Sequence, residues 1–522
     1  MEAVFTLQVL VRSWLAQSFN PVFAVFIAVQ RAFPSVDRVE LVSLLNRQGL
    51  PFPMIRAIAS TFAFTTSRLR MEGCLTETFP VNLGVREGDI ESPPLFNLVY
   101  GEILWVAGLD VISNDVFVPR DKRVVGIAYA DDFALMAQNI CSAQTSLDNM
   151  SIAMLTFNLR MNRDKTKLLI FVQKRKPRGF LGDIRSWQIC VEGQPIEMVC
   201  EFKYLGITLN FLCEPLTHPL SCESRAIAAA VQYGGLFRRL EITDFRKLRA
   251  FFLAFVQSQF HGSQIVSFSK ESMEKALMLF LRSCFSLPIG YPRAIFCELL
   301  DIDEFFLTQI RSRWRFFSRN IRLGRINSAL TQAFLHDREL FRLGIPCWSR
   351  DFCKIFESFY NERAFIELDL FEEESQITEL LRMESMSQRT LRMTLSPSAH
   401  LLRDLLPHRV TRSFLVSLSQ RSFEEVRLIL LFWGNMLRYC FFTGSVEICL
   451  LCSLPFNSEH FLSCTEINNN GVLGNWRLFL ENENWEGFIS FFFLVALEWI
   501  HPTNPVRLGH QKVNEKANGI SD

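Results

Sequence analysis

Two adjacent carboxylates, Asp131 and Asp132, interrupt the apolar stretch GIAYADDFALMAQ at residues 126–138. Strand-forming residues run up to Tyr129 and resume at Phe133, so the pattern predicts a β-hairpin with a tight turn that carries the two acids at its tip. Two like charges side by side are unfavourable unless something binds them. Carboxylates held at such a tip can bind Mg²⁺ for two-metal phosphoryl transfer, although a chance Asp pair in a surface turn is the alternative.

Length and composition indicate a folded chain with several cores. The chain has 522 residues, 49% of them hydrophobic, which excludes disorder and favours two to four domains. Its net charge of +1 gives no overall attraction to nucleic acid or anionic membrane. Fourteen Cys without a secretory leader indicate reduced cysteines, and every apolar run is shorter than the roughly 20 residues that span a bilayer. We therefore expect a soluble, intracellular protein with no membrane partner.

The pattern of the chain changes along its length. Residues 1–210 mix helical periodicity with short strand patterns at 22–29, 124–130 and 167–173, which predicts the α+β class. Long amphipathic stretches dominate residues 211–350 and predict a helical domain. Residues 351–522 are predicted to form a helical carboxy-terminal region.

A group of metal-ligand residues lies in that last region. Its spacing is Cys-x2-Cys-x7-His-x3-Cys, and its members are Cys449, Cys452, His460 and Cys464. Four such residues within 16 positions are typical of a closed tetrahedral Zn²⁺ site. Chance clustering among fourteen cysteines is the alternative.

Five sequence blocks in a fixed order resemble the reverse transcriptases of non-LTR retrotransposons and their group II intron relatives. These blocks are residues 1–38, NLGVREGDIESPPLFNLVY (82–100), AYADDFALMA (128–137), FNLRMNRDKTKLLIF (157–171) and CEFKYLGITLN (200–210). The resemblance implies a right-hand polymerase fold: a palm with a remnant of the fingers over 1–210, a helical thumb and connection over 211–350, and a zinc knuckle over 449–464. It also implies that the chain is truncated at the amino-terminal, fingers side.

The resemblance also implies an activity and its residues. The activity is RNA-directed DNA polymerisation, a nucleotidyl transfer that uses Mg²⁺, an RNA template and a DNA primer. Asp131 and Asp132 would hold the metal, and Lys165 of the fourth block would lie near the leaving pyrophosphate. Nucleotide contacts fall on Phe33, Gly88 and Tyr129. For Phe33 a plain core position and for Lys165 a plain exposed position are the alternatives.

Two departures from the family pattern weaken the predicted chemistry. The first block of the family ends its strand in Phe-Ile-Asp, but this chain has Phe26-Ile27-Ala28. We expect Ala28 to lie beside Asp131 on an adjacent antiparallel strand, so the principal partner of that acid is missing. Glu87 stands where the family has a Gln that contacts the incoming nucleotide, and its charge opposes a triphosphate.

Three functional hypotheses follow from these residues. The first is a retrotransposon-derived reverse transcriptase-like protein that is catalytically impaired by Ala28 and Glu87. The second is a working RNA-directed DNA polymerase that recruits another ligand. The third is a co-opted, non-catalytic nucleic-acid-binding protein, favoured by eight basic residues against one acid between positions 160 and 178. That basic run is also typical of a nuclear localisation sequence.

Overall fold

A computed structural model of the chain describes residues 1–17, 20–109, 124–129, 132–173, 187–214, 217–289, 291, 293–300, 302, 305–322, 329–360, 377–378 and 412–433. The chain divides into two compact units. Unit 1 comprises Met1–Pro219, Gln264–Val266 and Arg315–Leu368, and unit 2 comprises the remaining segments.

Unit 1 is built on a five-stranded sheet in the order β11-β8-β1-β7-β6. Its strands are β1 (Val22–Ile27), β6 (Val124–Tyr129), β7 (Asp132–Ala137), β8 (Lys167–Phe171) and β11 (Glu197–Val199). All neighbours pair antiparallel except β11 and β8, which are parallel. The strands predicted at 22–29, 124–130 and 167–173 are confirmed to within a few residues.

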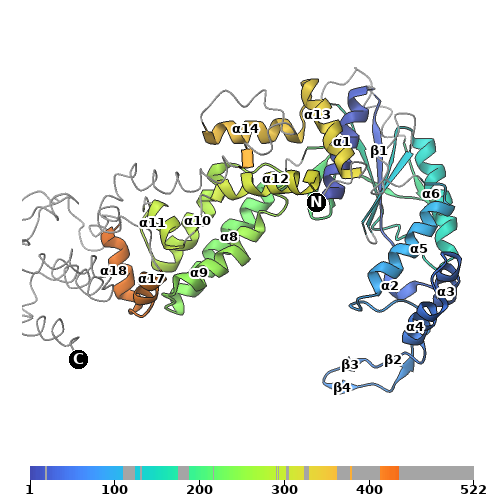
Figure 1. Cartoon of the computed structure of the whole chain (residues 1–522), viewed down its shortest axis with the longest axis horizontal. Coiled ribbons are helices and arrows are strands. Elements are labelled where there is room, and N and C mark those ends of the chain that lie inside the picture. The colour runs from blue at the N-terminus through green and yellow to red at the C-terminus, as the bar shows by residue number, and fades with distance from the viewer. Residues whose placement is uncertain are drawn as a thin grey trace, which may run out of the picture. The chain divides into compact units, whose positions relative to one another are not determined.

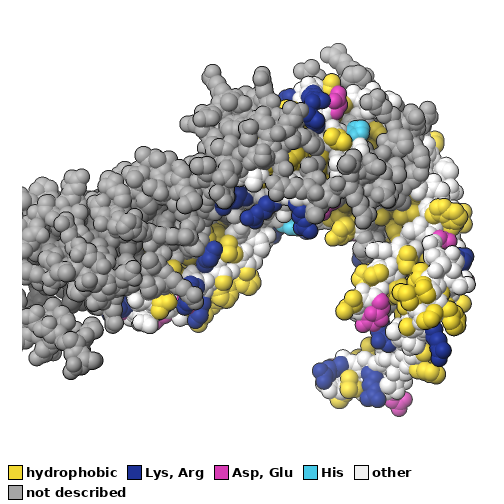
Figure 2. Space-filling view, viewed as in Figure 1, with side chains coloured by type: hydrophobic (Ala, Val, Ile, Leu, Met, Phe, Trp, Pro, Cys, Tyr) yellow, Lys and Arg dark blue, Asp and Glu magenta, His cyan; other side chains and the backbone are white. Residues whose placement is uncertain are grey.

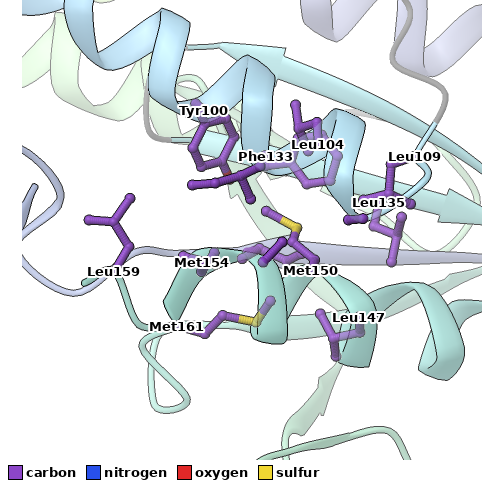
Figure 3. Close-up of a cluster of buried hydrophobic side chains, with 14 of the residues drawn as sticks. Tyr100, Leu104, Leu109, Phe133, Leu135, Leu147, Met150, Met154, Leu159 and Met161 are labelled. Atoms are coloured by element: carbon purple, nitrogen blue, oxygen red, sulfur yellow. The ribbon is translucent and has the colours of Figure 1, made fainter. Parts of the chain in front are cut away.

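Helices cover one face of this sheet and form its core. They include α3 (Arg38–Arg47), α5 (Ser92–Val106) and α6 (Ile140–Leu155), which α2 (Ala32–Ser35) and α4 (Phe52–Phe62) accompany. Figure 3 shows side chains of α5, β7 and α6 gathered in one buried cluster, among them Tyr100, Leu104, Phe133, Leu135, Leu147, Met150 and Met154. Burying this apolar surface is the main favourable term that holds the sheet and helices together.

Caps fix where the helices of this layer begin. The Asp37 carboxylate accepts the backbone N–H groups of Val39 and Glu40 at the start of α3. Asn139 does the same for Cys141 and Ser142 at the start of α6. Side-chain oxygens at these positions satisfy N–H groups that have no partner inside the helix.

Helix α1 (Glu2–Gln17) is buried on every side, including Thr6, Gln8 and Ser13. It contacts strands β1 and β6 and also helix α13 (Ala329–Arg342), which is distant in sequence. Phe5 lies 4.4 Å from Phe334 of α13 and 6.1 Å from Trp348 of α14 (Trp348–Tyr360), measured between ring centroids. Residues 329–360 therefore complete the core of unit 1 around α1 (Figure 1).

Short two-stranded ribbons complete unit 1. β12 (Glu201–Tyr204) pairs with β13 (Ile207–Asn210), and β9 (Cys190–Val191) pairs with β10 (Gln194–Pro195). A longer ribbon projects beyond α4 and contains β2 (Thr66–Ser67), β3 (Arg70–Met71), β4 (Cys74–Leu75) and β5 (Phe79–Pro80). Figure 2 shows basic and hydrophobic side chains together on this ribbon, where Met71 and Leu75 are more than half exposed.

Unit 2 is helical in its described residues. Its elements are α8 (Thr217–Arg239), whose first residues lie in unit 1, α9 (Phe245–Phe251), the π-helical turn η1 (Phe252–Val256), η2 (Gln257–Gln259), α10 (Lys270–Phe285), α11 (Arg293–Leu299), α12 (Phe305–Arg322), whose residues from Arg315 on lie in unit 1, α17 (Arg412–Ser419) and α18 (Phe423–Trp433). A Cβ at Gly234 of α8 would lie 2.6 Å from the Phe280 carbonyl oxygen of α10, so glycine permits the close approach of the two helices. The helical character predicted for 211–350 is confirmed where the structure describes it. Within the same described residues, no helix is both long and apolar enough to cross a membrane.

Candidate active site on the palm sheet

β1 ends at Ile27, and Ala28 follows it at the position where the resemblance implies the principal acid. Side chains of β1 alternate, so Phe23, Val25 and Ile27 join the helix-side core while Phe26 and then Ala28 lie on the opposite face, which we call the site face. The Ala28 N–H donates to Thr166 Oγ1 over 3.2 Å. The Ala28 carbonyl oxygen accepts the Asn162 N–H over 2.7 Å. Both backbone groups of Ala28 are therefore already hydrogen-bonded.

Register places Asp132 across from Ala28. β1 pairs with β7 through Phe26↔Ala134 and Ile27↔Phe133, so the next position of β1 falls opposite Asp132. Phe133 joins the helix-side core, which directs Asp132 to the site face, where it is exposed. The predicted pairing of strand 22–29 with the acidic hairpin is confirmed, and the acid that lies opposite Ala28 in register is Asp132. Asp131 lies outside the described residues.

The two strands of the acidic hairpin pair as predicted, but Asp132 does not lie in the turn where it was expected. Tyr129 at the end of β6 pairs with Asp132 at the start of β7, so two residues join the strands and Asp132 belongs to β7 rather than to the turn. The Tyr129 side chain is 56% exposed. It is therefore accessible to a ligand, as the predicted nucleotide contact requires.

An aromatic layer from β12 covers the site face next to Ala28. The rings of Phe202 and Phe26 stack with centroids 4.3 Å apart, and the Tyr204 ring lies 5.2 Å from that of Phe26. Tyr204 is 2% exposed. Burial, and secondarily the Asp132 charge, raise the pKa of the Tyr204 hydroxyl well above its ordinary value, so the hydroxyl stays protonated.

The fourth block supports the end of β1 through a polar turn. Thr166, which is fully buried, accepts from Ala28 and donates its own N–H to the Asn162 carbonyl oxygen over 2.8 Å. Lys165 is exposed beside it, and Lys167 forms an ion pair with Glu197 over 2.6 Å. Lys165 is thus exposed beside this turn, while the neighbouring Lys167 is engaged in the sheet.

The second block packs against the first through backbone contacts. The Gly84 N–H donates to the Val36 carbonyl oxygen over 2.8 Å, and the Val85 N–H donates to that of Phe33 over 2.9 Å. The Phe33 ring stacks on Phe96 of α5 with centroids 4.8 Å apart and is half-buried. Phe33 therefore has a packed side, as a core position requires, and an accessible side, as a nucleotide contact requires.

Two arginines hold this loop against the end of α4. Arg38 donates to the carbonyl oxygens of Gly84 (2.8 Å), Val81 (2.6 Å) and Phe62 (3.2 Å). Arg86 donates to the Thr61 carbonyl oxygen over 3.1 Å and pairs with Asp89 over 3.7 Å. Carbonyl groups at a helix carboxy-terminus favour cations. Burial, and then the Arg86 charge, lower the pKa of Arg38.

The loop beyond Arg86 is open. Glu87 is exposed, and Gly88 has a φ of +97° with no atom within 4 Å of the place that a Cβ would occupy. Only glycine adopts such a backbone conformation easily. Gly88 can therefore bring backbone close to a ligand, but the neighbouring carboxylate of Glu87 gives that surface a negative charge.

The remaining predicted ligands lie outside the described residues. These are the four of the zinc knuckle: Cys449, Cys452, His460 and Cys464. Among the residues that the structure does describe, no three His, Cys, Asp or Glu side chains gather to hold a metal ion.

Three residues of the site were not predicted from the sequence. Thr166 lies between two lysines and looks like part of an exposed turn, Tyr204 looks like a plain strand residue, and Arg38 looks like a surface cation. A small hydroxyl residue inside a charged turn that leads into a strand is the one local signal that points to Thr166, because such side chains often bond to nearby backbone.

Comparisons with known proteins agree with the block order. Residues 11–209 match the family model "Reverse transcriptase (RNA-dependent DNA polymerase)". The Pol polyprotein of the R2DM retrotransposable element of Drosophila melanogaster is 24% identical over 37% of this chain and 18% of its own length. The R2 Pol polyproteins of Nasonia vitripennis and Popillia japonica are 26% and 24% identical, over 18% and 30% of their lengths.

This chain therefore matches less than a third of the length of each of those relatives. The solved structure of telomerase from Candida tropicalis aligns at a TM-score of 0.29 and 12% identity, over 64% of this chain and 51% of that one, which is too distant to support an argument. The family match, the curated relatives and the strand pairing around Ala28 agree with one another. Residues 11–209 are therefore similar to reverse transcriptases, and the relatives with which this region aligns are Pol polyproteins of R2 retrotransposable elements.

Proposed function

We propose that this chain is a reverse transcriptase-like protein whose polymerase centre is impaired because it lacks the acid that should end β1. The observation that carries this proposal is the register of β1 and β7, which sets the methyl group of Ala28 opposite Asp132 on the site face. The resemblance to non-LTR reverse transcriptases assigns a metal-binding Asp to that position. The same chain therefore retains the palm but not its full set of acids.

The residues of the site face that the structure describes do not supply the ligands of a two-metal centre. Mg²⁺ requires about six oxygen ligands in near-octahedral geometry. Among the described residues of the site face, Asp132 supplies the carboxylate opposite β1, and the Ala28 carbonyl oxygen is already bonded to Asn162. Asp37 accepts two N–H groups as the cap of α3, so it does not replace the missing acid.

The second block adds an electrostatic obstacle to triphosphate binding. Arg86, the cation of that loop, is held by the Thr61 carbonyl oxygen and by Asp89. Glu87 is left exposed beside the open backbone of Gly88. A negative side chain at this place repels the phosphates that the family Gln would accept.

Metal affinity and primer extension test the proposal together. We expect the wild type to bind Mn²⁺ weakly and to extend no DNA primer on RNA. Ala28→Asp should strengthen Mn²⁺ binding at least tenfold, and adding Glu87→Gln should strengthen nucleotide binding further. Asp132→Asn should abolish the gain in metal affinity. Robust extension by the wild type that is lost in Asp131→Asn would overturn the proposal and identify a working polymerase.

Binding of primer–template without turnover is a second candidate function. It is favoured by Arg160, Arg163 and Lys165, which are exposed near the end of β1 and carry charge that attracts phosphates. Arg163 also bonds to Asp164 and Gln194, which fixes its position. The family match supports RNA as template and DNA as primer for this surface.

Salt dependence separates this candidate from a chain without nucleic-acid affinity. The logarithm of the binding constant should fall linearly with the logarithm of salt concentration. Replacing Arg160 and Lys165 by Ala should lower that slope by about 2, whereas Arg47→Ala, which removes an exposed ion pair with Glu102, should leave it unchanged. A slope near zero for the wild type would exclude this function.

A further inference from the structure

The Tyr204 hydroxyl is a buried polar atom that lacks a partner. The side chain is 2% exposed, and its oxygen makes no hydrogen bond to any described residue. Buried hydroxyl groups in folded proteins nearly always have a hydrogen-bond partner, and leaving one without a partner is unfavourable. The position of Tyr204 therefore needs an explanation beyond packing.

The surroundings of Tyr204 identify what is missing. Its ring lies against Phe26 at 5.2 Å, on the site face of β1. Ala28 follows on the same face, about 6.7 Å further along the strand. Asp132, opposite Ala28 in register, is close enough for its charge to act on Tyr204. The Tyr204 ring therefore packs on the face of β1 that also carries position 28, and a methyl group at that position cannot accept a hydrogen bond.

We propose that Tyr204 is a positioning residue for a carboxylate at position 28, and that Ala28 has left its hydroxyl without an acceptor. The inference rests on the proposed function, since it takes position 28 as the missing acid. With Asp at this position, the Tyr204 O–H donates to one carboxylate oxygen and leaves the other to face the metal. A donor behind a metal-binding carboxylate fixes its orientation, and losing such a donor typically weakens metal binding roughly 10–100-fold.

A double-mutant cycle in the full chain tests this inference. Its members are the wild type, Tyr204→Phe, Ala28→Asp and the double variant, compared by Mn²⁺ affinity from electron paramagnetic resonance and by urea denaturation midpoint. In the wild type, Tyr204→Phe should leave Mn²⁺ binding unchanged and should keep or raise the midpoint, because it removes an unsatisfied hydroxyl. In the Ala28→Asp background, the same change should weaken Mn²⁺ binding at least tenfold and lower the midpoint.

The control is Tyr233→Phe in unit 2, where a tyrosine ring packs against Phe255 at 4.7 Å. It should show no coupling to position 28 in either measurement. If Ala28→Asp does not fold, Ala28→Asn supplies an acceptor oxygen without charge. In the Ala28→Asn background, Tyr204→Phe should again lower the urea denaturation midpoint.

The outcomes separate this inference from the proposed function. An equal effect of Tyr204→Phe in both backgrounds overturns the role of Tyr204, even when Ala28→Asp gains Mn²⁺ affinity. Absence of any gain from Ala28→Asp overturns the missing-ligand assignment instead. In that case, coupling between positions 204 and 28 in the urea denaturation midpoint still supports a contact between the hydroxyl and the carboxylate. Absence of this coupling refutes the contact.

Discussion

Gly84 is the position where the structure predicts the sharpest effect of a single methyl group. Its φ is +81°, and a Cβ added there would lie 2.5 Å from the Pro34 carbonyl oxygen. A left-handed conformation costs a non-glycine residue roughly 1–2 kcal/mol. Raising the 2.5 Å approach to an ordinary 3.4 Å also requires a backbone shift of about 0.9 Å. Overpacking of this kind costs about 1–3 kcal/mol, so Gly84→Ala should destabilise unit 1 by about 2–5 kcal/mol.

Gly49→Ala is the matched control, because Gly49 has a φ of +76° with no atom within 4 Å of an added Cβ. It should cost only the conformational part, roughly 1–2 kcal/mol. Hydrogen exchange followed by mass spectrometry measures the local stability of unit 1 in both variants. A single midpoint from denaturation of the whole chain would combine the unfolding of the two units. The loss of protection from hydrogen exchange at residues 33–36 and 84–85 should be larger for Gly84→Ala than for Gly49→Ala. Equal losses of protection would refute the steric part of the reasoning.

Three further predictions concern other parts of the chain. A fragment spanning 440–475 should bind one equivalent of Zn²⁺ through Cys449, Cys452, His460 and Cys464. Metal analysis that finds no stoichiometric zinc in this fragment would reject the site. Iodoacetamide at pH 8 should label the exposed Cys74 and leave the buried Cys213 unmodified, because burial raises the pKa of the Cys213 thiol to about 11. Equal labelling of the two cysteines, measured by peptide mass spectrometry, would contradict this prediction. Arg38→Ala should lower the stability of unit 1 by about 2–3 kcal/mol, because it removes charged hydrogen bonds to three carbonyl groups. Arg47→Ala, which removes only an exposed ion pair, should lower it by less than about 0.5 kcal/mol, with both values measured by hydrogen exchange. Similar losses for the two variants would show that Arg38 acts only as a surface cation.

Local signals in the sequence determined the strands, the hairpin and the missing acid. The strand patterns around residues 22–29 and on both sides of the acidic pair depend on neighbours a few positions away, and the pairing of β6 with β7 formed as predicted. The absence of an acid at Ala28 is a property of the sequence itself.

Long-range contacts decided the rest. Which acid lies opposite Ala28 depends on a pairing between residues about a hundred positions apart, and a change of one residue in register would move every side chain to the other face. The burial of α1 on all sides depends on α13, more than three hundred residues away. Tyr204 looks like an ordinary strand residue until β12 folds over Phe26 and leaves its hydroxyl without an acceptor. The sequence by itself determined which chemical groups this protein has, and only the tertiary structure decided which of them meet, because contacts between distant segments leave no periodic signal in the chain.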